Sequence, residues 1–357
     1  MSLWRWPDLA ALVPAAARLS LGEGETPLVR SRRIGPSYGL SNLAFKIESA
    51  NPTGSYKDRF AAMAISLMTA RGQTRCLATS SGNTGAALAA YCAAAGIACE
   101  IAIVETAPEG KLRQMLAYGA DLYRVRGFGL DAGITTRTFA TLQRRAEQPD
   151  AALQISAFHY SPDGMRGVQS LAYELAEQAD GPIDHVFCPA GGGGLALAVA
   201  RGFEHLVRQG TLAALPRIEC VQPLGNDTIA GPLREGKAQA QSVDCTSQIS
   251  GLQVPGVIDG DETLAACRRS GGTGHLVTDE AVWEAQARLA REEGIFCEPA
   301  GATALAGALQ AARCGELAPD AAIICLVTGS GFKDAPSVER MVADRACPVV
   351  DLEGLVR

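Results

Sequence analysis

Residues 75–104 read RCLATSSGNTGAALAAYCAAAGIACEIAIV, and this stretch decides the class of the fold. A β-rich run at 75–79 is followed by a helix-length run at 84–95, which stops at Gly96, and then by an apolar run at 99–104. Two short apolar runs joined by a helix predict two parallel strands with a right-handed helical crossover. The sequence therefore predicts an α/β protein with a parallel sheet.

The same alternation continues towards the C-terminus. Further strands are expected at 121–126, 152–157, 183–189, 217–222 and 321–327, and helices at 108–118, 134–147, 168–178, 195–208, 279–293 and 302–313. The last of these strands contains Ile323-Ile-Cys-Leu-Val327, which is apolar on both faces, as a central strand of a parallel sheet is. The stretch 224–275 is less regular. Because no linker or internal repeat divides the chain, we expect interleaved rather than tandem domains.

Composition and charge exclude several classes of protein. At about 150 residues per domain, the 357 residues predict roughly two domains. The 32 basic and 38 acidic residues give a net charge of −6, which opposes attraction to the phosphates of nucleic acids. The most apolar long stretch, 85–104, contains Glu100 and is interrupted by Gly96, so we expect no membrane span. The first twenty residues lack the long apolar centre of a secretory signal, and we expect a cytoplasmic protein.

The cysteines do not form a recognisable framework. There are 11 of them, and no pair has the Cys-x-x-Cys spacing of zinc and redox sites. Buried thiols in a reducing compartment are the simpler interpretation. We therefore predict neither disulfides nor a metal site.

The first candidate site is the turn-rich stretch Asn51-Pro-Thr-Gly-Ser-Tyr-Lys57-Asp-Arg-Phe60, which precedes a helix-like run. It presents Lys57 at the start of that helix. A lysine amine is the nucleophile that imine chemistry requires. Considered alone, this stretch favours an ordinary surface lysine at position 57 over a catalytic one.

The second candidate site is Thr79-Ser-Ser-Gly-Asn-Thr-Gly85, between a predicted strand and a helix. Backbone N–H groups and short polar side chains at a helix N-terminus can bind a carboxylate or a phosphate. The alternative is a helix cap, because Ser, Thr and Asn all cap helices. A cap needs only one such residue, whereas this loop contains five.

The third candidate site is Cys188-Pro-Ala-Gly191-Gly-Gly-Gly194-Leu-Ala196, again between a strand and a helix. Successive glycines allow backbone amides to surround a phosphate at the helix N-terminus. The stretch also fits the Gly-x-Gly-x-x-Ala pattern of dinucleotide sites, so a nicotinamide-dependent oxidoreductase is an alternative. No acidic residue ends a strand about 20 residues further on, as that pattern requires.

The fourth candidate site is Thr328-Gly-Ser-Gly-Phe-Lys-Asp334, at the carboxyl end of the last apolar strand. Ligands of open α/β sheets bind outside these strand ends. The hydroxyl of Thr328 could contact a ring nitrogen without donating a full positive charge. Each loop alone is a weak indication of function.

Taken in order, from Gly24-Glu-Thr-Pro-Leu28 to Phe332-Lys-Asp334, these stretches resemble the fold-type II pyridoxal-phosphate (PLP) enzymes of the tryptophan synthase β-subunit superfamily, and within them the threonine synthase branch. The resemblance implies two open, doubly wound, mainly parallel α/β domains with the active site in the cleft between them. A smaller domain of about 70–163 would sit within a larger one made of 1–69 and 164–357. PLP as cofactor and a homodimer are also implied.

The resemblance assigns roles to individual residues. Lys57 matches the catalytic lysine, which also binds the cofactor through a Schiff base. The other matches to cofactor-binding positions are Asn83, Gly191, Gly192, Gly193, Gly194 and Thr328, and the matches to substrate-carboxylate positions are Ser80, Ser81, Gly82 and Thr84. The fourth loop separates the branches, because dehydratases and cysteine synthases usually have a serine followed by Gly-Gly, whereas threonine synthases resemble Thr-Gly-x-Gly-Leu-Lys-Asp.

The implied reaction is elimination or replacement on a small amino-acid substrate, with O-phosphohomoserine and water giving threonine and phosphate. One departure concerns the leaving group: Gly164 stands where the branch commonly has the arginine that binds the substrate phosphate, and Gln169 replaces a lysine. Arg166, two positions away, is a substrate-binding candidate or a solvated residue at a helix start. A serine/threonine dehydratase, or another PLP enzyme of β-elimination or β-replacement, remains an alternative, as does a non-catalytic sensor.

Overall fold

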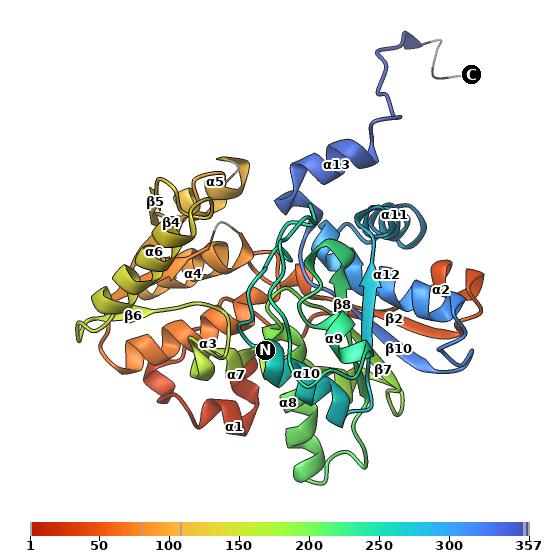
Figure 1. Cartoon of the computed structure of the whole chain (residues 1–357), viewed down its shortest axis with the longest axis horizontal. Helices are drawn as coiled ribbons and strands as arrows, with labels where there is room; N and C mark the ends of the chain where they lie inside the picture. Colours follow the sequence, from red (N-terminus) through yellow and green to blue (C-terminus); the bar gives the residue numbers. More distant parts are fainter. Residues whose placement is uncertain (1, 81, 108, 353–354, 356–357) are drawn as a thin grey trace.

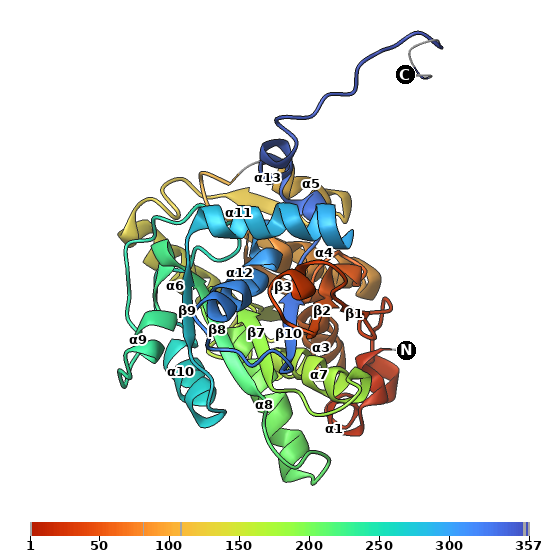
Figure 2. The same ribbon diagram turned by 90° about the vertical axis from the view of Figure 1, so that its right-hand side faces the viewer.

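Two β-sheets organise the chain in a computed structural model that describes residues 2–80, 82–107, 109–352 and 355. Figure 1 shows the four-stranded sheet with α4, α5 and α6 on one side of the molecule and the six-stranded sheet with α11 and α12 on the other. Residues 343–352, which follow α13, project away from the body in both ribbon views (Figures 1 and 2). The predicted α/β architecture is confirmed.

The larger sheet has the strand order β1-β2-β10-β7-β8-β9. Its strands are β1 (Leu28–Arg30), β2 (Asn42–Ile47), β7 (His185–Pro189), β8 (Arg217–Pro223), β9 (Gly274–Val277) and β10 (Ala322–Val327). All neighbouring pairs are parallel except β1 with β2. The last strand of the chain, β10, lies in the interior of this sheet beside β2, which explains why it is apolar on both faces.

The smaller sheet has the order β5-β4-β3-β6 and is parallel throughout. Its strands are β3 (Arg75–Thr79), β4 (Ala98–Ile103), β5 (Asp121–Arg124) and β6 (Ala151–Leu153). All four fall inside the predicted smaller domain of 70–163, while the domain boundaries themselves stay a prediction. The opening stretch 75–104 forms β3, a helix and β4, with Arg75 paired to Ala98 in register.

Helices cover both sheets. They are α1 (Pro7–Ala10), α2 (Ile34–Ser37), α3 (Lys57–Ala70), α4 (Asn83–Ala95), α5 (Glu109–Ala117), α6 (Ala132–Arg145), α7 (Pro162–Gln178), α8 (Gly194–Arg208), α9 (Ala230–Arg234), α10 (Gly260–Arg269), α11 (Asp279–Arg288), α12 (Pro299–Arg313) and α13 (Ala335–Met341). Within the described ranges, no helix is both long enough and apolar enough to cross a membrane.

The structure corrects two helix predictions. The helix expected at 168–178 begins at Pro162, because proline is well suited to the first helical turn and Gly167 lets α7 pack closely on α3. The helix expected at 279–293 changes to a π-helical turn after Arg288 and ends at Gly294, which has a φ of +71°. The irregular stretch 224–275 contains α9, α10 and the start of β9.

Candidate active site

Lys57 is the first residue of α3, as the sequence predicts. The preceding turn contains Gly54 in the left-handed region, at a φ of +87°. The Lys57 amine donates a hydrogen bond to the hydroxyl of Ser156 over 2.5 Å and lies 4.4 Å from the centre of the Tyr56 ring. Lys57 is therefore held inside a set of polar contacts and is not a freely solvated surface lysine.

Ser156 connects Lys57 to the second loop. Its hydroxyl lies 3.0 Å from that of Thr84 in the first turn of α4. Gly82 is the N-cap of α4 and supplies no side-chain cap, while its own N–H donates to the Ser80 hydroxyl over 3.2 Å. The Thr84 hydroxyl consequently faces the lysine and does not cap the helix. Ser81, also predicted here, lies outside the described residues.

The glycine loop forms the turn between β7 and α8. Gly193 has a φ of +96°, and a Cβ there would lie 2.3 Å from Oγ1 of Thr263. A Cβ on Gly194 would lie 2.9 Å from Oδ2 of Asp259 and 3.5 Å from the backbone oxygen of Ser156. Only glycine fits at Gly193, and the loop reaches the residue that is hydrogen bonded to Lys57.

Asn83 and Thr328 lie at the junction of the second and fourth loops. Asn83 donates its side-chain N–H to Glu298 over 2.7 Å, and a Cβ on Gly329 would lie 3.1 Å from the same nitrogen. The backbone oxygen of the buried Thr328 accepts the backbone N–H of Tyr56, next to Lys57, over 3.1 Å. The fourth loop thus contacts the first and second loops, and Ser156 links the glycine loop to Lys57 and Thr84.

Glu298 has an unusual environment for a carboxyl group. Burial raises its pKa to about 7, and the positive charge of Lys333 together with the hydrogen bond from Asn83 opposes that rise. Glu298 begins α12 as its N-cap, but its side chain makes no cap hydrogen bond and turns to Asn83 instead. A proton-binding group of near-neutral pKa therefore lies beside a predicted cofactor ligand.

Two lysines join α5 to the fourth loop. The Lys333 amine donates to Gln114 over 2.7 Å, and its pKa is lowered by burial. The Lys111 amine lies 3.5 Å from the Asp334 carboxylate and also bonds the hydroxyl of Ser250. These contacts connect the smaller sheet's helix to the C-terminal part of the chain and add positive charge to the candidate site.

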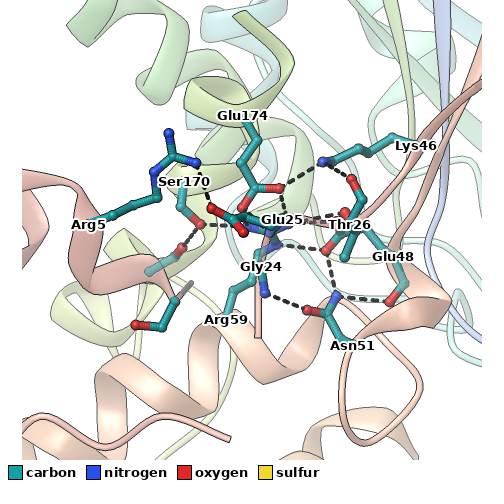
Figure 3. A network of polar contacts seen from close by, with 12 residues as sticks. Arg5, Gly24, Glu25, Thr26, Lys46, Glu48, Asn51, Arg59, Ser170 and Glu174 are labelled. Atoms are coloured by element: carbon teal, nitrogen blue, oxygen red, sulfur yellow. Dashed lines mark hydrogen bonds and ion pairs between the residues drawn. The ribbon is translucent and has the colours of Figure 1, made fainter. Parts of the chain in front are cut away.

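A buried ionic network fixes the helix that carries Lys57 (Figure 3). The Arg59 guanidinium contacts Glu48 over 2.7 Å and Glu174 over 2.6 Å, and all three residues are buried. Lys46 of β2 contacts Glu174 over 2.7 Å. Because the two positive and two negative side chains balance, the network anchors α3 to β2 and α7 without a net buried charge.

The two residues predicted to decide the leaving group do not lie with the others. A Cβ on Gly164 would be 2.8 Å from the Phe60 ring, so α7 packs against α3 at this point and a long side chain does not fit. Arg166 lies on the side of α7 near Tyr173, whose hydroxyl donates to Asp8. Within the described part of the chain, the side chain of Arg166 makes no hydrogen bond or ion pair, and its role in substrate binding stays a prediction.

Several residues of this site were not predicted from the sequence. Ser156 follows a short strand without any motif, although its place beyond the end of β6 is where a ligand-facing side chain is expected. Lys333 stands in the fourth loop but was given no role. The stretch Glu298-Pro-Ala-Gly-Ala302 resembles a turn that closes over the cofactor ring in fold-type II enzymes, and the simplest role predicted for it was to start the next helix. A cavity of about 440 Å³ lies at the opposite edge of the larger sheet and is lined partly by His185, Glu219 and His275. None of the predicted site residues in the described ranges lines that cavity.

The residues present fit PLP. A lysine amine, a glycine turn that a Cβ would fill, and a buried threonine hydroxyl lie on adjoining loops, which is the donor set that an aldehyde, a phosphate and a ring nitrogen require. The backbone amides at the start of α8 favour an anionic ligand such as a phosphate.

Comparison with known proteins agrees with this geometry. Residues 19–329 match the family model described as "Pyridoxal-phosphate dependent enzyme". The chain is 31% identical to the threonine synthase of Methanocaldococcus jannaschii over 343 residues, covering 95% of this chain and 82% of that relative. It is 33% identical to the threonine synthase of Mycobacterium leprae over 347 residues, which cover 95% of this chain and 91% of that relative.

Among solved structures, the chain is similar to the serine racemase of maize, with a TM-score of 0.75 and 25% identity over 98% of both chains. The fold-type II architecture predicted from the four loops is thereby confirmed. By the family match and by its relatives, this chain belongs to the pyridoxal-phosphate-dependent enzymes, and its cofactor is PLP.

Proposed function

We propose that the protein is a threonine synthase, which converts O-phosphohomoserine and water to threonine and phosphate. The observation that carries this proposal is the identity of 31–33% to relatives of that name over nearly the whole chain. The Thr328-Gly-Ser-Gly-Phe-Lys-Asp334 loop supports the same branch. Phe332 replaces the usual leucine and is 88% exposed, so this replacement does not disturb the core.

Lys57 is proposed to move protons at the substrate. When bound, PLP supplies an electron sink that stabilises negative charge at the substrate Cα. The Lys57 amine then takes the proton from Cα and returns protons to the neighbouring carbons, as a general acid–base group does. Ser156 holds the amine through the 2.5 Å hydrogen bond and limits the directions in which it can point.

The other residues are proposed to bind and orient. The hydroxyls of Ser80 and Thr84 and the backbone at Gly82 hold the substrate carboxylate at the start of α4. The amides of Gly191 to Gly194 hold the cofactor phosphate, and Asn83 binds the phenolic oxygen. Thr328 offers a neutral hydroxyl to the ring nitrogen, which favours elimination and replacement over transamination.

A dehydratase acting on serine or threonine is the second candidate. The specific observation in its favour is the packing of Gly164 against Phe60, which leaves no room at that position for a phosphate-binding arginine. In a threonine synthase the phosphate charge must then be met by another cation. Lys333 and Lys111 are cations near the fourth loop.

The two candidates are separated by their products. Purified enzyme is incubated with O-phosphohomoserine, threonine or serine, and inorganic phosphate and keto acid are measured in parallel. Phosphate release with threonine formation is expected, and Lys57→Ala is expected to abolish it. Keto acid formed from threonine or serine without turnover of O-phosphohomoserine would identify a dehydratase and overturn the proposal.

A homodimer in the cytoplasm is part of the same proposal. The many buried free thiols fit a reducing compartment. Light scattering of the purified holoenzyme at several concentrations is expected to give twice the chain mass. A single-chain mass at all concentrations would contradict the dimer without affecting the proposed reaction.

A further inference from the structure

Three cysteines meet in the smaller sheet, away from the candidate active site. Cys76 lies on β3, Cys92 on α4 and Cys99 on β4, and their sulfur atoms all lie within 4.8 Å of one another. All three are buried, and Cys76 and Cys99 are direct register partners. The strand-helix-strand unit thus brings three thiols together. Cys92 is 16 positions after Cys76 in the sequence, and Cys99 is 7 positions after Cys92.

The separation of the sulfurs suits one bound ion. If three sulfurs surround an ion in a plane at a metal–sulfur distance of about 2.3 Å, each pair is about 4.0 Å apart. The observed arrangement has to contract by less than about 1 Å to reach that geometry. A disulfide between any two of these cysteines would leave the third thiol unused.

The number of ligands distinguishes between metals. Structural zinc sites are tetrahedral and need four protein ligands. In the described part of the chain, the group contains no fourth His, Cys, Asp or Glu ligand atom. Soft thiolate ligands select Cu(I), which does not require a fourth ligand.

We propose that Cys76, Cys92 and Cys99 form a binding site for one Cu(I) ion. The ion binds without a change of oxidation state: Cu⁺ and three thiols give one Cu–thiolate bond, two Cu–thiol contacts and one released proton. The assembled site is electrically neutral, so no net charge is placed in the apolar core. This proposal is independent of the reaction that the enzyme catalyses.

The cluster is close to solvent at one end. Cys99 is 6% exposed, and Ala98 beside it is exposed. Asn83 begins the same helix nine residues before Cys92, a separation of about 13 Å along α4. An ion can therefore reach the thiols from the N-terminal ends of β3 and β4 without passing through the candidate active site.

The test is a Cu(I) titration of the holoenzyme without oxygen, in competition with the chromophoric chelator bicinchoninate. The exposed thiols are first removed in a Cys314→Ser, Cys347→Ser background. One Cu(I) per chain is expected, with a three-sulfur environment by X-ray absorption. Adding Cys99→Ala or Cys92→Ala is expected to weaken binding by about tenfold or more, because loss of even a residue that hydrogen bonds to a metal ligand costs about 10–100-fold in affinity.

Cys267→Ala in the same background is the matched control, because Cys267 is also buried but lies outside the cluster. Visible absorbance of bound PLP and far-UV circular dichroism report whether each variant folds. The proposal is overturned if the background protein binds no Cu(I), if Cys99→Ala and Cys92→Ala bind it as the background does, or if Cys267→Ala weakens binding equally. If one cluster variant does not fold, the other decides.

Discussion

The Lys57 amine and the Ser156 hydroxyl form a 2.5 Å hydrogen bond between residues 99 positions apart in the chain. Lys57 begins α3, and Ser156 follows β6 of the smaller sheet. The same hydroxyl lies 3.0 Å from that of Thr84. The proposed catalytic amine is therefore positioned by the sheet that also presents the proposed substrate loop.

Ser156→Ala is expected to lower kcat about 10–100-fold, less than the roughly 10²–10⁴-fold attributed to a general acid–base group itself. The hydroxyl positions the amine and does not replace it, so PLP should still bind with its visible absorbance. A changed pH profile of kcat and recovery in Ser156→Thr distinguish positioning from a merely structural effect. Unchanged kcat and an unchanged pH profile in Ser156→Ala would contradict this role.

Gly193→Ala is expected to destabilise the cofactor-free protein by about 1–3 kcal/mol and to weaken PLP binding. The left-handed φ of +96° and the 2.3 Å approach to Thr263 are the reasons. Gly192→Ala is the control for stability, because a Cβ there meets only an ordinary contact of 3.4 Å with Val254. The free energy of unfolding of both variants is measured in urea. Equal losses of stability in the two variants would show that the left-handed conformation of Gly193 does not cause the destabilisation.

Arg59→Met is expected to cost about 3–5 kcal/mol of unfolding free energy, because it removes the ion-pair partner of the buried Glu48 and leaves Glu174 paired with Lys46 alone among the described residues. The exposed pair of Arg30 and Asp180 provides the contrast, and Arg30→Met is expected to cost less than about 1 kcal/mol. Chemical denaturation measures both. A loss for Arg59→Met no larger than that for Arg30→Met would mean that the network does not anchor α3.

Glu298→Gln is expected to alter how stability depends on pH. Burial raises the pKa of Glu298 from 4.5 to about 7, so the native state holds a proton that the unfolded chain has already released between these pH values. The stabilisation from that proton is complete below about pH 4.5 and is lost as the pH rises towards 7. In cofactor-free protein, Glu298→Gln should therefore lose less stability than wild type over this range.

Denaturation midpoints at several pH values test the Glu298 prediction. The exposed Glu339→Gln on α13 is the control and should follow the wild-type curve. Because glutamine can still accept the hydrogen bond from Asn83, the comparison isolates the titrating proton. Parallel curves for wild type and Glu298→Gln would show that this carboxyl group does not titrate in the folded protein near neutral pH.

Local patterns were sufficient for much of the fold. The strand at 75–79 has the bounds that its residues predict, and Lys57 begins its helix as expected. Helix starts are less certain where packing intervenes: α7 begins six residues before the predicted Val168, because its glycines pack against α3. Strand β2, buried between β1 and β10, was not predicted because its position depends on distant partners.

The sequence by itself determined the α/β class, the four loops and their order, because strand and helix periods and turn residues act over a few neighbouring positions. Only the tertiary structure decided which side chains meet. It placed Ser156 against Lys57, Glu298 against Asn83 and Phe60 against Gly164. It also brought Cys76, Cys92 and Cys99 together, although their spacing matches no metal motif. These contacts follow from sheet order and helix packing, which bring together residues that are far apart in the chain. The sequence around each residue does not indicate which distant residue it will contact.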